Sequence, residues 1–364
     1  MKKINLLAVA LAAFTMFSCS NEEIADLGSN APGEKATLTI KVEGAGNNVA
    51  QSRVAGSAGG TTTDVVINDY IVFIFRDGGA LDCPAYYSST NAAATITNGT
   101  TAAKTAYVIA NTGALANGPF ANVTTEADLK AVTGDLISGN AATQTKNNLW
   151  MSGTDDITFS GTDGSVTVQL GFVAAKIELI VKDNRTNLTG GTIEITDENV
   201  VLLYAGKSGK FFGTTADKAA QTAFYSGDVS YPDFQAGVAT ESAVLKDAVG
   251  ATFTANANGD VFNHFYTFGN DGTSKPTILA IQSKRTVGGA DETIYYPIQF
   301  TVADAGNTIE PGNAYTVTLT LNGDVSAGGG GGTTNPEQPL VKSQITVTVT
   351  AATWLAKTVS KDFN

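Results

Sequence analysis

Short segments in which apolar residues alternate with polar ones, most often threonine, recur along this chain of 364 residues and restrict its fold most strongly. Residues 36–43 (ATLTIKVE), 315–321 (YTVTLTL) and 344–350 (QITVTVT) place every second side chain on one face of an extended strand. Residues 70–75 (YIVFIF) are apolar throughout, as in a central strand buried on both faces. Glycine, asparagine and aspartate between these segments supply turns. The pattern predicts an all-β fold with few short helices.

Two short helices are expected among these strands. Residues 125–132 (TEADLKAV) have helical character with Thr125 as the N-cap, and residues 239–249 suggest a second short helix. The hydrophobic content of 43% over this length suffices for one large or two ordinary domains. We place the domain boundary near residues 171–175, where one alternating strand ends and another begins.

The N-terminus has the pattern of a lipoprotein signal. Lys2 and Lys3 precede a short apolar run from Leu6 to Phe17, and Ser18 and Cys19 follow it. The run is shorter than the ~20 residues of a membrane-spanning helix. A buried N-terminal helix is the alternative, but the chain turns polar directly after Cys19. We therefore expect residues 1–18 to be a signal peptide and Cys19 to carry the lipid that holds an exported precursor on the outer membrane.

Only one cysteine remains after lipidation of Cys19. Cys83 has no partner within the mature chain, so no intramolecular disulfide is expected. A reactive thiol and an intermolecular bridge are both open, but we favour a small apolar core residue.

Composition and motifs argue against several classes of function. The net charge of −12 leaves no basic stripe for nucleic acid. His264 is the single histidine, without a Gly-x-Ser-x-Gly motif or paired cysteines for a catalytic or zinc site. Acidic pairs flank turn residues, and no calcium-loop motif is present. We expect no catalytic residues, no metal, no cofactor and no enzymatic activity.

Three features combine into a more specific hypothesis. The chain is lipid-anchored, its first strand precedes a loop of small residues that contains Arg53, and its last strand follows the five glycines of residues 328–332. A trypsin-like protease reaches an isolated arginine in such a loop. Cleavage between Arg53 and Val54 would remove the first strand and leave an apolar groove with unpaired backbone.

The last strand has the form of a donor for that groove. Ile345, Val347 and Val349 share one face, and Trp354 follows, so we expect these four residues to enter the groove of another subunit by strand addition. Such a contact is head-to-tail and produces an open filament. In the alternative, residues 36–43 stay in place and the last strand folds back onto its own domain. The protein would then be a monomeric, lipid-anchored surface protein that binds glycans or host ligands.

In these features the chain resembles the fimbrillin family, the lipoprotein-derived subunits of type V pili. The motifs that carry the resemblance run in order along the chain: Met16-Phe17-Ser18-Cys19, Arg53-Val54-Ala55, Val72-Phe73-Ile74-Phe75, Trp150-Met151-Ser152-Gly153, Ala174 to Leu179, Pro311 to Tyr315, and Val347 to Trp354.

The resemblance implies two transthyretin-like β-sandwich domains, at residues 54–173 and 174–364. Residues 19–53 would be a propeptide that is removed by a trypsin-like protease, and the donor tail would start at about residue 340. The partners would be other copies of the chain, together with anchor and tip pilins. Because a cleavage site and a donor strand are both present, a stalk subunit is favoured.

Overall fold

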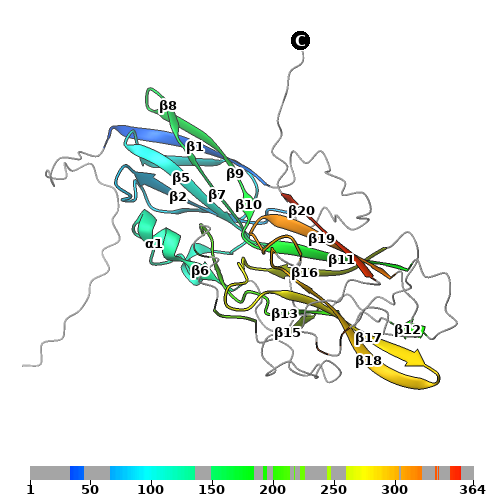
Figure 1. Ribbon diagram of the computed structural model, residues 1–364. Helices are drawn as coiled ribbons and strands as arrows, with labels where there is room; N and C mark the ends of the chain where they lie inside the picture. The colour runs from blue at the N-terminus through cyan, green and yellow to red at the C-terminus, as the bar shows by residue number, and fades with distance from the viewer. Residues whose placement is uncertain are drawn as a thin grey trace, which may run out of the picture.

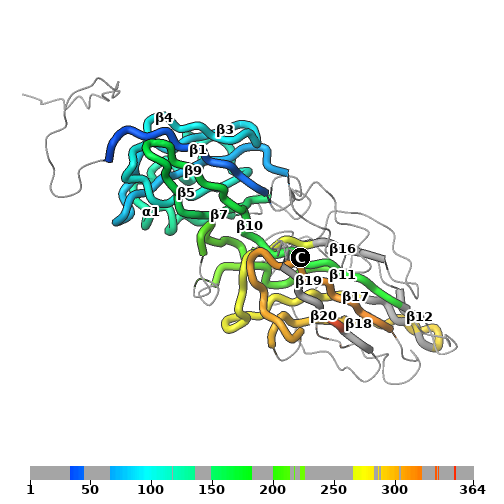
Figure 2. The backbone as a smooth tube through the Cα atoms, turned by 90° about the horizontal axis from the view of Figure 1, so that it is seen from above, coloured from blue at the N-terminus to red at the C-terminus, as the bar shows by residue number. Residues whose placement is uncertain are grey.

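The computed structural model describes residues 33–44, 66–135, 149–183, 192–194, 200–213, 217, 222–225, 244–246, 260–302, 305–321, 333, 335 and 345–353. Strands dominate these residues, and they form two sandwiches that lie end to end (Figure 1, Figure 2). The predicted all-β fold with two domains is confirmed.

The N-terminal sandwich packs a four-stranded sheet on a five-stranded sheet. The first has the order β4 (Ala94–Thr100), β1 (Lys35–Glu43), β9 (Asp163–Gln169), β8 (Thr158–Ser160), and the second the order β10 (Gly171–Phe172), β7 (Met151–Asp156), β5 (Ala103–Ala110), β2 (Tyr70–Arg76), β3 (Tyr86–Ser88). The inward side chains of both sheets form one core, which includes Leu38, Val72 and Val108. As the apolar run predicts, the side chains of residues 70–75 are all buried.

The C-terminal sandwich repeats this arrangement. One sheet has the order β16 (Asp260–Thr267), β11 (Ala175–Asp183), β19 (Asn313–Leu321), β20 (Ile345–Thr353), and the other the order β12 (Thr192–Glu194), β17 (Ile278–Val287), β13 (Val200–Leu203), β15 (Val244–Lys246), with β18 (Ala290–Gln299) also paired to β17. The core between them includes Leu179, Tyr296 and Val317.

Aromatic side chains from both sandwiches meet at their junction. The ring centroid of Phe211 in the second sandwich lies 4.9 Å from those of Phe120 and Trp150 in the first, with an edge-to-face contact to Phe120 and a tilted contact to Trp150. The short strands β6 (Thr133–Gly134) and β14 (Gly209–Lys210) pair across the same junction. The described parts of the two units are therefore joined by packing and by backbone hydrogen bonds.

Helices are short in the described part of the chain. The α-helix α1 (Glu126–Ala131) begins after Thr125, whose side chain accepts a hydrogen bond from the Asp128 N–H in a capping box, as the sequence predicts. A 3-10 turn, η1, spans Leu115–Asn117. The prediction of a helix near residues 239–249 is wrong at the residues that the structure describes there, because Val244–Lys246 is strand β15, which pairs with β13. None of the described helices is long and apolar enough to cross a membrane.

Candidate functional site: the groove filled by the first strand

Strand β1 lies inside its sheet, between β4 and β9. It pairs antiparallel with β4 and parallel with β9, so hydrogen bonds hold it on both sides. Its inward side chains, Ala36, Leu38, Ile40 and Val42, are buried, and its other side chains face solvent to differing extents. The alternation predicted from the sequence is confirmed. We call the space that β1 fills between β4 and β9 the β1 groove.

The sides of the β1 groove are the backbones of β4 and β9, and its floor is the second sheet. Inward side chains of that sheet, among them Tyr70, Val72 and Ile74, belong to the same core cluster as Leu38 and Ile40. If β1 left, these apolar groups and two rows of backbone hydrogen-bonding groups would meet water. An emptied β1 groove is therefore a binding site for an extended apolar strand.

Glycines shape the middle of the β1 groove. Gly164 of β9 lies directly opposite Leu38, and Gly99 of β4 approaches Leu38 from the other side. A Cβ atom built on Gly99 would lie 2.6 Å from Leu38 Cδ1, and one built on Gly164 would lie 2.6 Å from Leu38 Cδ2. The Leu38 side chain therefore occupies the space that side chains at these two positions would need.

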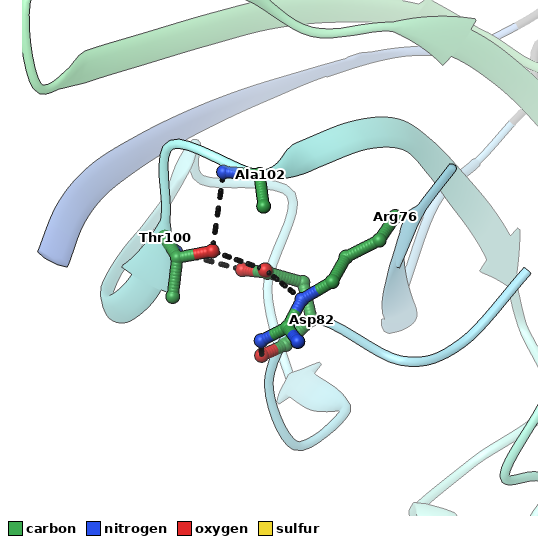
Figure 3. A network of polar contacts seen from close by, with 4 residues as sticks. All are labelled: Arg76, Asp82, Thr100 and Ala102. Carbon is green, nitrogen blue, oxygen red and sulfur yellow. Dashed lines mark hydrogen bonds and ion pairs between the residues drawn. The ribbon is translucent and has the colours of Figure 1, made fainter. Parts of the chain in front are cut away.

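A buried carboxylate fixes the end of β4, where the β1 groove begins (Figure 3). The Asp82 side chain accepts hydrogen bonds from Arg76 Nε at 2.8 Å, from the Thr100 N–H at 2.7 Å and from the Thr100 hydroxyl. Thr100 Oγ1 in turn accepts from the Ala102 N–H at 3.2 Å, which holds the turn between β4 and β5. The Asp82 side chain is fully buried, and none of these charge-assisted bonds involves a residue of β1.

Hydrogen bonds also hold β1 near both of its ends. The Thr101 N–H donates to the Glu34 carbonyl at 2.8 Å, and the Leu170 N–H donates to the Glu43 carbonyl at 2.9 Å. The Gln169 side-chain amide donates to the Glu43 carboxylate. Hydrogen bonds thus hold the strand near both ends as well as along its two sides.

The last strand occupies a different kind of position. β20 is at the end of its sheet and pairs with β19 alone among the described strands, with Leu321 opposite Ile345, Leu319 opposite Val347 and Val317 opposite Val349 (Figure 1). The Val349 side chain is half-buried against the C-terminal core, and Thr348 is exposed. The last strand is therefore folded back onto its own domain, in the arrangement set out above as the alternative.

The chain before β20 is attached to its own domain at one further point. Thr333 exchanges two backbone hydrogen bonds with Tyr295 of β18, at 2.7 and 2.9 Å. The sequence predicts only a flexible linker here. An isolated bridge of one residue produces no alternation of apolar and polar residues that could reveal it in the sequence.

The remaining predicted site residues are only partly covered by the structure. Cys19, Arg53, Val54 and Trp354 lie outside the described residues. His264 lies in β16, with its backbone opposite Glu178. Among the described residues, no group of three or more His, Cys, Asp or Glu side chains is placed to hold a metal ion.

Cys83 is a core residue, as expected. It is 5% exposed, belongs to the N-terminal core cluster, and burial raises the pKa of its thiol to about 12. A protonated, buried thiol is a poor nucleophile at neutral pH.

Two family models match the chain, one on each sandwich. "Major fimbrial subunit protein (FimA)" matches residues 36–168, and "FimA-like major fimbrial subunit protein, C-terminal domain" matches residues 174–354. This chain belongs to the fimbrillin family. The resemblance found in the sequence is thereby confirmed. The match to the first family begins within β1, and the match to the second ends just after β20.

Solved structures agree with this assignment. A candidate cell adhesion protein from Bacteroides eggerthii is 58% identical, with a TM-score of 0.73 over 90% of this chain and 98% of that one. Two candidate cell adhesion proteins from Parabacteroides distasonis share the fold at 16% and 15% identity, with TM-scores of 0.58 and 0.54. The first of these matches covers 88% of this chain and 97% of that one, and the second 88% and 99%. No curated protein matches the chain significantly.

Proposed function

We propose that this fimbrillin is a stalk subunit that polymerises into an adhesive surface fimbria by protease-triggered donor-strand exchange. The precursor is carried to the outer membrane as a lipoprotein acylated on Cys19. A trypsin-like protease then cuts between Arg53 and Val54, β1 leaves, and β20 of another subunit enters the emptied β1 groove. Anchor and tip pilins are the further partners at the two ends of the filament.

The internal position of β1 is the observation that carries this proposal. Leu38 and Ile40 are 0% exposed and Val42 is 9% exposed. Burial of such side chains contributes about 1.5–3 kcal/mol each. An emptied β1 groove therefore favours any strand that restores these contacts and the backbone pairing on both sides.

The edge position of β20 supplies the second half of the proposal. β20 has one neighbouring strand, so its release breaks one row of hydrogen bonds and the β1 groove replaces it with two. The chain from Thr333 to Ile345 spans up to about 40 Å when extended, at roughly 3.4 Å per residue. Because donor and groove belong to different sandwiches, repeated exchange produces an open chain of subunits.

Limited proteolysis of the purified precursor, residues 20–364, tests the proposal. We expect a new N-terminus at Val54 by mass spectrometry and a ladder of multimers on an unboiled denaturing gel. The Arg53→Ala precursor is the control and stays monomeric. Cleavage at Val54 without a ladder would instead favour the monomeric, lipid-anchored protein that binds glycans or host ligands.

A matched pair of charge substitutions tests the role of β20. Val349→Asp places a carboxylate on the face of β20 that packs on the core, whereas Thr348→Asp places it on the exposed face. We expect Val349→Asp to abolish the ladder after cleavage, because the charge would enter an apolar groove. Thr348→Asp should polymerise normally, and equal ladders from both variants would exclude β20 as the donor.

A further inference from the structure

The space around Leu38 forms a pocket within the β1 groove. Gly99 and Gly164 are both buried, and neither has a positive φ angle, so the backbone does not require glycine at either position. What these positions exclude is a side chain, because Leu38 Cδ1 and Cδ2 fill the space. We call the space that Leu38 fills between Gly99 and Gly164 the Leu38 pocket, and it accepts a side chain that extends to a δ carbon. Ile157 and Phe159 lie on its Gly164 side, next to the position of a Cβ atom built on that glycine.

The other inward positions of β1 differ in size. Ala36 fills a small space, whereas Ile40 and Val42 fill larger ones. In the direction of β1 the β1 groove thus accepts a small residue, then a δ-carbon residue in the Leu38 pocket, then isoleucine, which also reaches a δ carbon, and then valine. This size order distinguishes both the register and the direction of an incoming strand.

We propose that Ile345 of one subunit fills the Leu38 pocket of the next and that the donor strand runs in the direction of β1, parallel to β9. This inference rests on the proposed donor-strand exchange. Among the alternating apolar residues Ile345, Val347 and Val349, only isoleucine has a δ carbon. Placing Ile345 at Ile40 instead would put Ser343 in the Leu38 pocket and bury a hydroxyl among apolar groups. In this register Ser343, Val347 and Val349 take the places of Ala36, Ile40 and Val42.

The opposite direction fits the β1 groove poorly. With Ile345 in the Leu38 pocket, a reversed strand places Val347 where Ala36 lies and Ser343 where Ile40 lies. Ala36 is 2% exposed and Ile40 is 0% exposed, so the first change overfills a packed site and the second buries a hydroxyl among apolar groups. The same-direction register avoids both costs.

Engineered cysteines on the outward face test this register. Thr95 of β4 is exposed and lies directly opposite Thr39 of β1. In the proposed register Thr346 takes the place of Thr39, so the double variant Thr95→Cys and Thr346→Cys should link subunits through a disulfide. Before cleavage Thr39 of β1 occupies the position opposite Thr95, and Thr346 pairs with Thr320 of its own domain, so no specific link should form. The buried Cys83 should remain unreactive.

Two control variants report the competing arrangements. Thr95→Cys with Thr348→Cys reports a shift of two residues that places Val347 in the Leu38 pocket. Thr95→Cys with Gln344→Cys reports the reversed strand and also the opposite shift, in which Ile345 takes the place of Ile40. After cleavage and mild oxidation, we expect at least about tenfold more reducible multimer from the Thr346 variant than from either control, because a disulfide requires opposed Cβ atoms.

Failure of the register and failure of the exchange are separable by the unboiled gel. If wild type forms a ladder but a control variant cross-links as well as or better than the Thr346 variant, the register is wrong and donor-strand exchange stands. If wild type forms no ladder after cleavage at Val54, the exchange and the register both fall.

Discussion

Strands β1 and β20 have the same length and nearly the same pattern but very different positions. Each has nine residues, with three branched apolar side chains at alternate positions: Leu38, Ile40 and Val42 in β1, and Ile345, Val347 and Val349 in β20. The residues between them are threonine and lysine in β1 and threonine in β20. β1 has a neighbour on both sides and its inward side chains are buried, whereas β20 pairs with a single one of the described strands and Val349 is only half-buried. The number of neighbouring strands, rather than the sequence pattern, decides how firmly each strand is held.

This contrast suits the proposed donor-strand exchange, in which β1 leaves once and β20 moves to another subunit. Because β1 fills the β1 groove, a second strand could enter only after β1 had left. β20 covers one edge of its own sheet, and an exposed edge would pair with other chains. Segments with fewer buried contacts open locally at a lower free energy.

The largest predicted effect compares a charge in each strand of the uncleaved precursor. Ile40→Asp buries a carboxylate in the N-terminal core and should lower the free energy of unfolding by on the order of 4 kcal/mol or more. Val349→Asp, at a half-buried position on an edge, should cost about 1 kcal/mol. Urea unfolding measures both, with the outward Thr39→Asp as the control. Equal losses of unfolding free energy for Ile40→Asp and Val349→Asp would show that β1 is held no more firmly than β20.

The second effect concerns β4, which forms one side of the β1 groove, rather than the strand β1 that fills it. Asp82→Asn keeps the size of the side chain but removes the charge that holds Arg76 and Thr100, and should cost about 2–3 kcal/mol. Asp77→Asn, at an exposed position next in the chain to Arg76, is the control. If the network fixes β4, hydrogen exchange at the Thr100 amide should also quicken. An unchanged exchange rate would show that β1 alone holds β4.

The third effect tests how closely β1 fits between its two neighbours. Gly164→Ala places a Cβ atom against Leu38 and should destabilise the precursor by about 1–3 kcal/mol. The double variant with Leu38→Ala should be destabilised by less than the sum of the two single changes, because the Cβ atom added at Gly164 then enters space that the Leu38 side chain no longer fills. Thermal unfolding of the single and double variants measures the coupling, with Ser165→Ala as the control. Strict additivity would mean that the Leu38 pocket does not contact Gly164 as described.

Much of this fold follows from local pattern, since alternation marks β1 and β19, and Thr125 marks the start of α1. The helix expected near residues 239–249 fails because Val244–Lys246 pairs with β13, and pairing to a distant strand overrides local preference.

The Leu38 pocket was not predictable from the sequence for a related reason. Gly99 and Gly164 occur in segments that look like turns, beside Asn98 and Asp163, yet both lie within strands. Their role appears only once β4 and β9 are brought to either side of β1, and sequence spacing carries no record of that pairing. The contribution of Asp82 is hidden likewise, because its partners lie on different strands.

The smallest predicted effect concerns the attachment of the tail, which bears on how easily β20 leaves. Thr333→Pro removes the N–H that donates to the Tyr295 carbonyl and should lower the free energy of unfolding by about 0.5–1 kcal/mol, because water replaces a bond at a partly exposed residue. Thr333→Ala keeps that N–H, so the difference between the two variants isolates the backbone bond. If the attachment restrains the tail, the proline variant should also form the ladder about twofold faster after cleavage, since release of β20 then breaks fewer contacts. Equal ladder rates for both variants would show that pairing with β19 alone limits the release of β20.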